Sequence, residues 1–125
     1  MDEKGKILVA IVGSHVDTVT EISNYLETHG FKTVWAYLGN EAVPLCQSTH
    51  PDLIIMDVVM SGMGGFEVAK ILPNQKFLFM TAMDELENKA STFRNSIGLI
   101  KKPIDFEELE SKIKKHFKIP MKSIA

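Results

Sequence analysis

The chain has 125 residues, of which 45% are hydrophobic and 24% are charged, and its formal net charge is -2. This length suits one compact domain with a single core. The charge balance excludes the basic field that nucleic-acid binders use, and no apolar run approaches the roughly 20 residues that span a bilayer. A single cysteine, Cys46, excludes an internal disulfide and suits a reducing compartment, so we expect a cytoplasmic domain.

Strand-like and helix-like segments alternate along the chain. Short apolar runs bounded by turn residues predict strands at 7–12, 33–37, 53–56, 77–80 and 97–100. Helices are predicted between them, from Ser14 to before Gly30, and over 41–48, 66–72, 84–94 and 105–117. This alternation predicts an α/β fold with a five-stranded parallel sheet and helices on both faces.

Three predicted helix starts carry the spacing of a capping box, in which a short polar side chain precedes an acidic residue by three positions. The pairs are Ser14 with Asp17, Asp84 with Glu87, and Asp105 with Glu108. Pro44 is expected in the first turn of the second helix, where its missing N–H costs little.

Polar side chains stand where the predicted strands end. In open parallel sheets, ligands bind outside the carboxyl ends of the strands. The candidates at that edge are Gly13 with Ser14, Asp57, Thr81 and Lys102. A carboxylate, a hydroxyl and an ammonium group would thus converge on one crevice, and this combination suits phosphoryl chemistry.

The segments that carry these residues resemble response-regulator receiver domains. Residues 52–65 resemble the stretch around the phosphorylated aspartate of that family, 79–82 its Thr/Ser-Ala motif, and 101–103 its Lys-Pro motif. The resemblance runs from about Lys6 to Phe117, so we assign 5–118 to a receiver domain and 119–125 to a short C-terminal tail.

The resemblance implies a flavodoxin-like doubly wound fold and a role for each matched residue. Asp57 would be the phosphoacceptor, Thr81 would hydrogen-bond the phosphoryl group, and Lys102 would pair with its charge. The Lys102–Pro103 peptide bond would be cis, as proline permits.

Several positions depart from the family pattern. Gly13 and Ser14 stand where the family has the two acidic residues that anchor Mg²⁺, and Asp17, the nearest acid, is interpreted as a helix-capping residue. Leu99 occupies the position of the switch aromatic. Asp57 and Lys102 alone sum to zero charge, and one carboxylate is a poor cage for Mg²⁺. We therefore expect no bound metal or other cofactor and no catalytic residues.

The function that follows is that of an atypical receiver, or pseudo-receiver, in a two-component phosphorelay. It would signal through protein contacts and would not be an enzyme. Its partners would be a histidine kinase, an effector or a second copy, through the face of the fourth helix, fifth strand and fifth helix; no nucleic-acid or membrane binding is expected.

Two alternatives remain open. The first is a receiver that a histidine kinase still phosphorylates at Asp57. The second is a flavodoxin-like protein that binds FMN or another phosphate ligand, because the turn at Gly13 and Ser14 could hold an anion at a helix N-terminus. That reading would need aromatic residues around the ligand, and the candidates are Trp35 and Tyr37.

Overall fold

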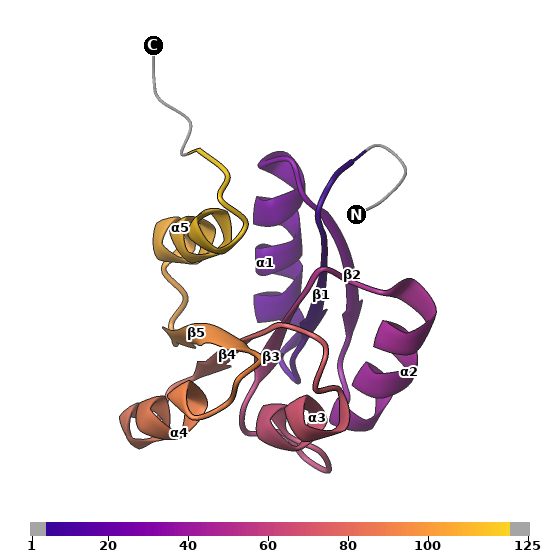
Figure 1. The fold of residues 1–125 in the computed structure, drawn as a ribbon, viewed down its shortest axis with the longest axis vertical. Helices are drawn as coiled ribbons and strands as arrows, with labels where there is room; N and C mark the ends of the chain where they lie inside the picture. Colours follow the sequence, from indigo (N-terminus) through magenta and orange to yellow (C-terminus); the bar gives the residue numbers. More distant parts are fainter. Residues whose placement is uncertain (1–4, 121–125) are drawn as a thin grey trace.

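The computed structural model describes residues 5–120, which form five strands that alternate with helices (Figure 1). The strands are β1 Leu8–Val12, β2 Lys32–Ala36, β3 Leu53–Asp57, β4 Phe77–Thr81 and β5 Ser96–Lys101. The helices are α1 Val16–Thr28, α2 Gly39–Thr49, α3 Gly65–Ile71, the 3₁₀ turn η1 Asp84–Leu86, α4 Glu87–Ser91 and α5 Phe106–His116.

All strand pairs are parallel, and their order across the sheet is β2-β1-β3-β4-β5. The predicted doubly wound fold is therefore confirmed. The chain order reverses between β1 and β3, which is where such sheets open a crevice at their carboxyl edge. Val12 of β1 is in register with Met56 of β3, so Gly13 and Asp57 follow side by side.

Each face of the sheet has its own hydrophobic core. Alternate strand residues point to opposite faces, so Val9 and Ile11 meet α1 and α5, whereas Ala10 and Val12 meet α2, α3 and α4. Figure 1 shows this separation, with α1 and α5 together and the other helices across the sheet. Every residue of β3 and β4 is buried, because both faces of these central strands are covered.

Only one of the three predicted capping residues caps its helix. The Asp105 carboxylate accepts a hydrogen bond from the backbone N–H of Glu108 at 3.1 Å. The prediction for Ser14 is wrong, since the N-cap of α1 is His15, which makes no side-chain capping bond. The prediction for Asp84 is also wrong: its carboxylate pairs with Lys101, and the expected helix over 84–94 is divided into η1 and the short α4.

Pro44 lies deeper in its helix than the sequence suggested. Helix α2 begins at Gly39, two residues earlier than predicted, so Pro44 is the sixth residue and the first-turn placement is wrong. Its missing N–H leaves the carbonyl of Asn40 without the usual helical donor. The proline is exposed, so water can reach that part of the helix.

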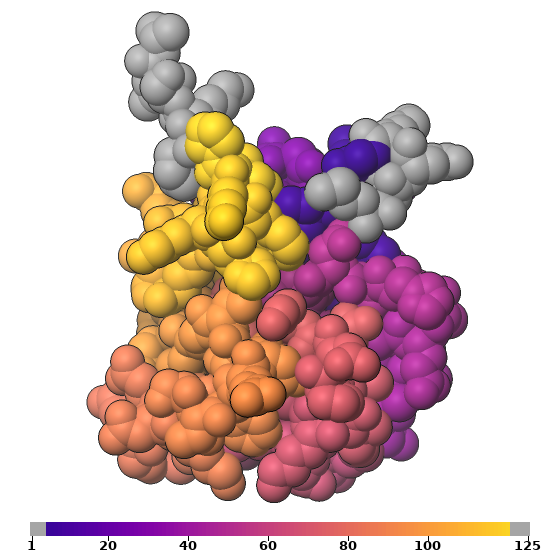
Figure 2. All heavy atoms as spheres, in the orientation of Figure 1, coloured from indigo at the N-terminus to yellow at the C-terminus, as the bar shows by residue number. Residues whose placement is uncertain are grey.

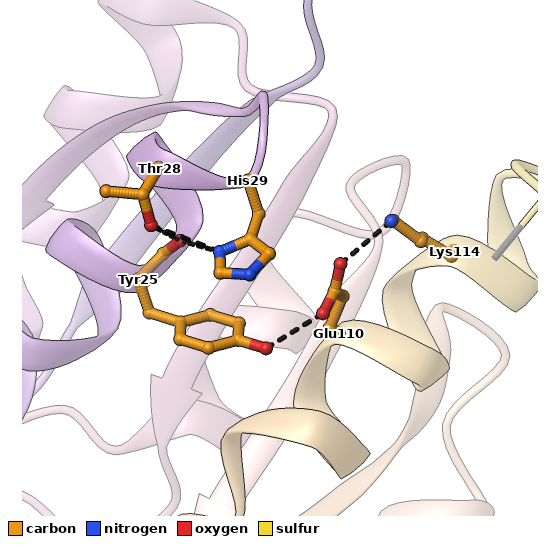
Figure 3. Close-up of polar contacts among 5 residues, drawn as sticks. All are labelled: Tyr25, Thr28, His29, Glu110 and Lys114. Atoms are coloured by element: carbon orange, nitrogen blue, oxygen red, sulfur yellow. Dashed lines mark hydrogen bonds and ion pairs between the residues drawn. The ribbon is translucent and has the colours of Figure 1, made fainter. Parts of the chain in front are cut away.

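A polar cluster joins α1 to α5 across the first face (Figure 3). The Tyr25 hydroxyl donates to Glu110 at 2.8 Å, and Lys114 pairs with the other carboxylate oxygen at 2.8 Å. The His29 ring stacks on Tyr25 with centroids 4.0 Å apart, and its Nδ1 lies 2.7 Å from the Tyr25 carbonyl oxygen. Burial raises the pKa of Glu110, but the bonds from Lys114 and Tyr25 outweigh it and hold that pKa below its ordinary value.

The C-terminal third of the chain gathers on one side of the molecule. Figure 2 shows its orange and yellow atoms as a continuous surface beside the purple and magenta atoms of the first half.

Within residues 5–120, no helix has both the length and the apolar character needed to cross a membrane.

Candidate functional site at the carboxyl edge of the sheet

The predicted site residues do meet at the carboxyl edge of the sheet. Asp57 is the last residue of β3 and is only 3% exposed. Thr81 ends the neighbouring strand β4, and its carbonyl accepts a hydrogen bond from the backbone N–H of Lys102 at 2.9 Å. The edge therefore brings a carboxylate, a hydroxyl and an ammonium group into one region, as the sequence predicted.

Asp57 and Lys102 form an ion pair, with Nζ 2.5 Å from Oδ1. The carboxylate side chain is 4% exposed and the lysine side chain 23%, so water screens the pair only from the lysine side. Removing one partner of such a pair leaves an uncompensated charge, which costs about 3–5 kcal/mol in buried cases. The cis peptide bond predicted between Lys102 and Pro103 is present.

The space that a side chain at position 13 would enter is occupied by the other oxygen of Asp57. A Cβ atom added to Gly13 would lie 2.9 Å from Asp57 Oδ2 and 3.2 Å from Val19 Cγ2. The glycine is anchored, because its N–H donates to the Ala36 carbonyl at 3.2 Å. An acidic side chain at position 13 would therefore require the Asp57 carboxylate to move, while Ser14 lies exposed beyond the strand.

The residues at this edge do not fit a magnesium ion. Mg²⁺ prefers near-octahedral oxygen ligands and retains its waters. Asp57 is the carboxylate at the crevice, and one of its oxygens already contacts Lys102. Asp17 lies in the first turn of α1 and is exposed, and no group of three potential metal ligands occurs among residues 5–120.

Thr81 has a structural task in this conformation. Its side chain is buried, and Oγ1 accepts a hydrogen bond from the backbone N–H of Met83 at 3.1 Å. This bond closes the turn after β4, the local pattern expected of threonine at a strand end. The hydroxyl proton of Thr81 can still be donated to a ligand, since the bond to Met83 uses only an oxygen lone pair.

Leu99 sits beside Phe79 in the β4–β5 register and packs, partly buried, against the second core. The side chain has no ring that could move between two positions. Trp35 lies on the edge strand β2, where with Tyr37 it lines a groove against α1. The other residues that line this groove all belong to α1, and neither Asp57 nor Lys102 is among them. The groove therefore gives no support to the FMN hypothesis, which needs aromatic residues around a ligand at the carboxyl edge.

Comparison with known proteins decides the family. The sequence profile described as the response regulator receiver domain matches residues 9–114. The chain belongs to the response-regulator receiver family. This receiver domain is 31% identical over 115 residues to the transcriptional regulatory protein YvrH of Bacillus subtilis, covering 88% of the chain and 48% of that relative.

Other relatives differ in length. Sporulation initiation phosphotransferase F of Bacillus subtilis is 29% identical over 107 residues, which cover 82% of the receiver domain and 85% of the relative. A two-component response regulator from Clostridium difficile superposes with a TM-score of 0.82 at 23% identity, covering 90% and 97% of the two chains. The receiver domain thus spans about half of YvrH but most of phosphotransferase F.

Sequence reasoning missed one ion pair next to the receiver site. Lys101, the last residue of β5, pairs with Asp84 at the start of η1, and the hydrogen bond to Asp84 raises the pKa of Lys101. The available signal was their place near two strand ends, because Lys101 ends β5 and Asp84 lies three residues after the end of β4. The sequence pattern of Asp84 indicated a capping role instead, and the competing partner was visible only in three dimensions.

Proposed function

We propose that this receiver domain signals mainly in its unphosphorylated form, through protein contacts, and that magnesium-dependent phosphorylation of Asp57 is impaired. One observation carries the proposal: the Asp57 carboxylate lies between Lys102 and the backbone of Gly13. This arrangement supports the proposal in two ways. Asp57 is neutralised by Lys102, and its second oxygen occupies the space that an acidic side chain at position 13 would need.

Charge counting supports the same conclusion. In the family, three carboxylates, one lysine and a divalent cation sum to zero. Here Asp57 and Lys102 sum to zero by themselves. A metal ion contributes several kcal/mol to phosphoryl transfer as a Lewis acid, which corresponds to a rate factor of about a thousand or more. A site without the acidic pair forgoes that contribution.

The proposed partners are those of the family: a histidine kinase, an effector or a second copy of the chain. We infer that the contact face comprises α4, β5 and α5, since the C-terminal third forms one continuous surface (Figure 2). The chain would act as a non-enzymatic pseudo-receiver, and membership of this signalling family supports a cytoplasmic location. Its relatives include a transcriptional regulatory protein and a phosphotransferase, and the role proposed for this chain is that of a regulator that acts through protein contacts.

A second candidate is a receiver that is still phosphorylated at Asp57. Two features favour it: Lys102 is already within contact of the carboxylate, and the Thr81 hydroxyl keeps a proton to donate. In this reading, a phosphoryl group on Asp57 would draw Lys102 and Thr81 toward its oxygens.

The two candidates differ in their response to Mg²⁺ and beryllofluoride, which stands in for the phosphoryl group on an aspartate. We expect the amide NMR spectrum to ignore millimolar Mg²⁺ and to ignore beryllofluoride added afterwards. Incubation with acetyl phosphate should likewise leave the mass unchanged, with or without Mg²⁺.

The Asp57→Asn variant is the control for every addition. Amide shifts at Gly13, Asp57, Thr81 and Lys102 that appear in the parent chain and vanish in Asp57→Asn would establish the second candidate. Shifts that persist in Asp57→Asn would come from binding elsewhere in the molecule and would not support phosphorylation at Asp57.

A further inference from the structure

A basic hollow lies at the amino edge of the sheet, opposite Asp57. It is formed by the residue before β4, the first residues of β5 and the last turns of α5. The lining residues are Lys76, Ser96, Ile97, Lys112, Lys115 and His116. Its volume is about 490 Å³, within the range of about 300–1,000 Å³ typical of small-molecule sites.

A bulge in β5 builds the floor of this hollow. Phe77 is in register with Ser96 and Leu78 with Gly98, so Ile97 is an extra residue without a partner on β4. Gly98 has a φ of +140°, a conformation that side chains disfavour, and a Cβ there would lie 3.9 Å from the Lys112 amine. The Ser96 hydroxyl accepts from the Gly98 N–H at 3.1 Å and so holds the bulge closed. Bulges of this kind commonly re-aim side chains near binding sites.

The charges in the hollow are almost all of one sign. Three lysines and His116 line it, and none of its described lining residues is acidic. An acidic neighbour of the hollow is Glu108, whose carboxylate lies 3.9 Å from the Lys112 amine, at the limit of an ion pair. Burial, together with the charge of Lys76, lowers the pKa of His116. The cations therefore repel one another, and an anion in the hollow would relieve that repulsion.

The helix dipole explains only part of this arrangement. Lysines in the last turn of a helix complement its partial negative charge, so Lys115 and His116 have a structural reason to be there. Lys76 belongs to a different segment, before β4, so the preference for basic residues within the last turn of α5 does not explain its presence in the hollow. Even if Glu108 offsets the charge of Lys112, the charges of Lys76 and Lys115 exceed the roughly half-charge at the helix end, so the lining of the hollow carries a net positive charge.

We propose that this hollow is a binding site for a small, multiply charged phosphate anion, of the size of pyrophosphate or the phosphate tail of a nucleotide. Lysine is a common phosphate ligand that acts as a point charge, and three of them surround one concavity. A concave site with cations around a single volume suits a compact anion better than an extended acidic peptide. The site does not involve Asp57, so it stands or falls independently of the proposed function.

The test is a titration of the ¹⁵N-labelled full chain with inorganic pyrophosphate, followed by amide shifts and by the ring resonances of His116. We expect saturable shifts at Lys76, Ile97, Lys112 and His116, and a rise in the His116 pKa as the anion offsets the lysine charges. A Lys76→Gln/Lys115→Gln variant removes two exposed cations from the hollow. Its affinity for pyrophosphate should fall about tenfold or more at fixed salt.

The matched control is Lys70→Gln/Lys89→Gln, which removes two exposed lysines from α3 and α4 and so changes the net charge equally. The control should bind pyrophosphate as the parent does. Equal loss in both variants would mean a diffuse charge effect and would overturn the proposal. Tighter binding of poly-glutamate than of pyrophosphate would also overturn it, because the surface would then be a peptide-docking site.

Discussion

Gly13 leaves room for the Asp57 carboxylate at the carboxyl edge of the sheet, because Asp57 Oδ2 occupies the space that a side chain at position 13 would enter. Substitution to alanine adds one methyl group against a carboxylate oxygen at 2.9 Å and a valine methyl at 3.2 Å. Overpacking of this kind costs about 1–3 kcal/mol. We expect Gly13→Ala to lower the free energy of unfolding by that amount in urea titrations followed by circular dichroism.

The neighbouring Ser14 provides the control. It is exposed, so Ser14→Ala should change the free energy of unfolding by no more than about 0.5 kcal/mol. If Gly13→Ala were as stable as Ser14→Ala, the Asp57 carboxylate would have room to move, and the filled-space argument for impaired metal binding would lose its support.

At the scale of single residues, the sequence predicted which side chains meet but not how tightly. Asp57, Thr81 and Lys102 could be assigned to one edge because each directly follows, or ends, an apolar strand. The contact of Gly13 with Asp57 could not be predicted, since it depends on the twist and spacing of two neighbouring strands. The pairing of Asp84 with Lys101 was hidden for the same reason.

Among the helices, α1 and α5 are held together by a tyrosine–glutamate bond that can be removed cleanly. Tyr25→Phe deletes the hydroxyl that donates to the largely buried Glu110 carboxylate. A hydrogen bond to a charged group contributes about 1.5–3 kcal/mol, and Lys114 continues to pair with the carboxylate. We expect a loss of roughly 1–2 kcal/mol at pH 7 in urea titrations.

This loss should depend on pH. The folded-state pKa of Glu110 is below its ordinary value, so its stabilising contribution is complete above the unfolded carboxyl pKa of about 4.3 and disappears as the pH falls through the lower folded value. The difference between parent and Tyr25→Phe should therefore be constant from about pH 5.5 to 8 and shrink in acid.

Tyr37 supplies the matched control as the other tyrosine of the chain. Tyr37→Phe makes the same chemical change at a partly buried site of β2's carboxyl end, and its effect should not follow the pH profile of Tyr25→Phe. Identical profiles would show that the acid dependence arises elsewhere, and the Glu110 bond would then have no special part in joining the two helices.

The three capping patterns show where element-level prediction stops. The same spacing occurs at Ser14, Asp84 and Asp105, yet only Asp105 accepts a bond from the helix N-terminus. Asp84 has a lysine within reach and forms an ion pair instead. The local sequence spacing indicates which hydrogen bonds a side chain is able to form. The neighbours in the folded structure determine whether it caps the helix or forms an ion pair instead.

For the whole molecule, Cys46 is a built-in reporter of unfolding. Its side chain is buried in the second core, and burial raises the pKa of the thiol to about 11. At pH 8 only about one thiol in a thousand would be ionised in the folded chain, and the thiolate is the reactive form. We expect iodoacetamide to label the native protein at least about 100-fold more slowly than the protein in 8 M urea, as measured by intact mass.

Because the chain has one cysteine, each labelled molecule reports a single event. Labelling that rises in parallel with the loss of circular dichroism along a urea series would mean that the second core opens with the rest of the fold. Fast labelling without denaturant would reveal local opening of α2 and contradict a single cooperative unit.

The overall architecture was the part best predicted from sequence. Five apolar runs separated by helical segments permit few arrangements, and the parallel order follows from the crossover helices. The fourth helix was the exception. Its predicted span of 84–94 is divided into η1 and α4, and Asp84 at the start of this segment pairs with Lys101 of β5.

Strand β5 also sets the distance between the basic hollow and the Asp57–Lys102 pair, which lie at opposite edges of the sheet. It has six residues, Ser96–Lys101, with the basic hollow at its start and the Asp57–Lys102 pair just past its end. At about 3.3 Å per residue the two regions lie roughly 16–20 Å apart, beyond the Debye length of about 8 Å at physiological salt. An anion in the hollow would therefore act only weakly on the Asp57–Lys102 pair through the solvent. Binding in the hollow would therefore leave the Asp57–Lys102 pair as the proposed function has it, unphosphorylated and neutral, so a phosphate signal would be registered at one pole of the domain while the other stays at rest.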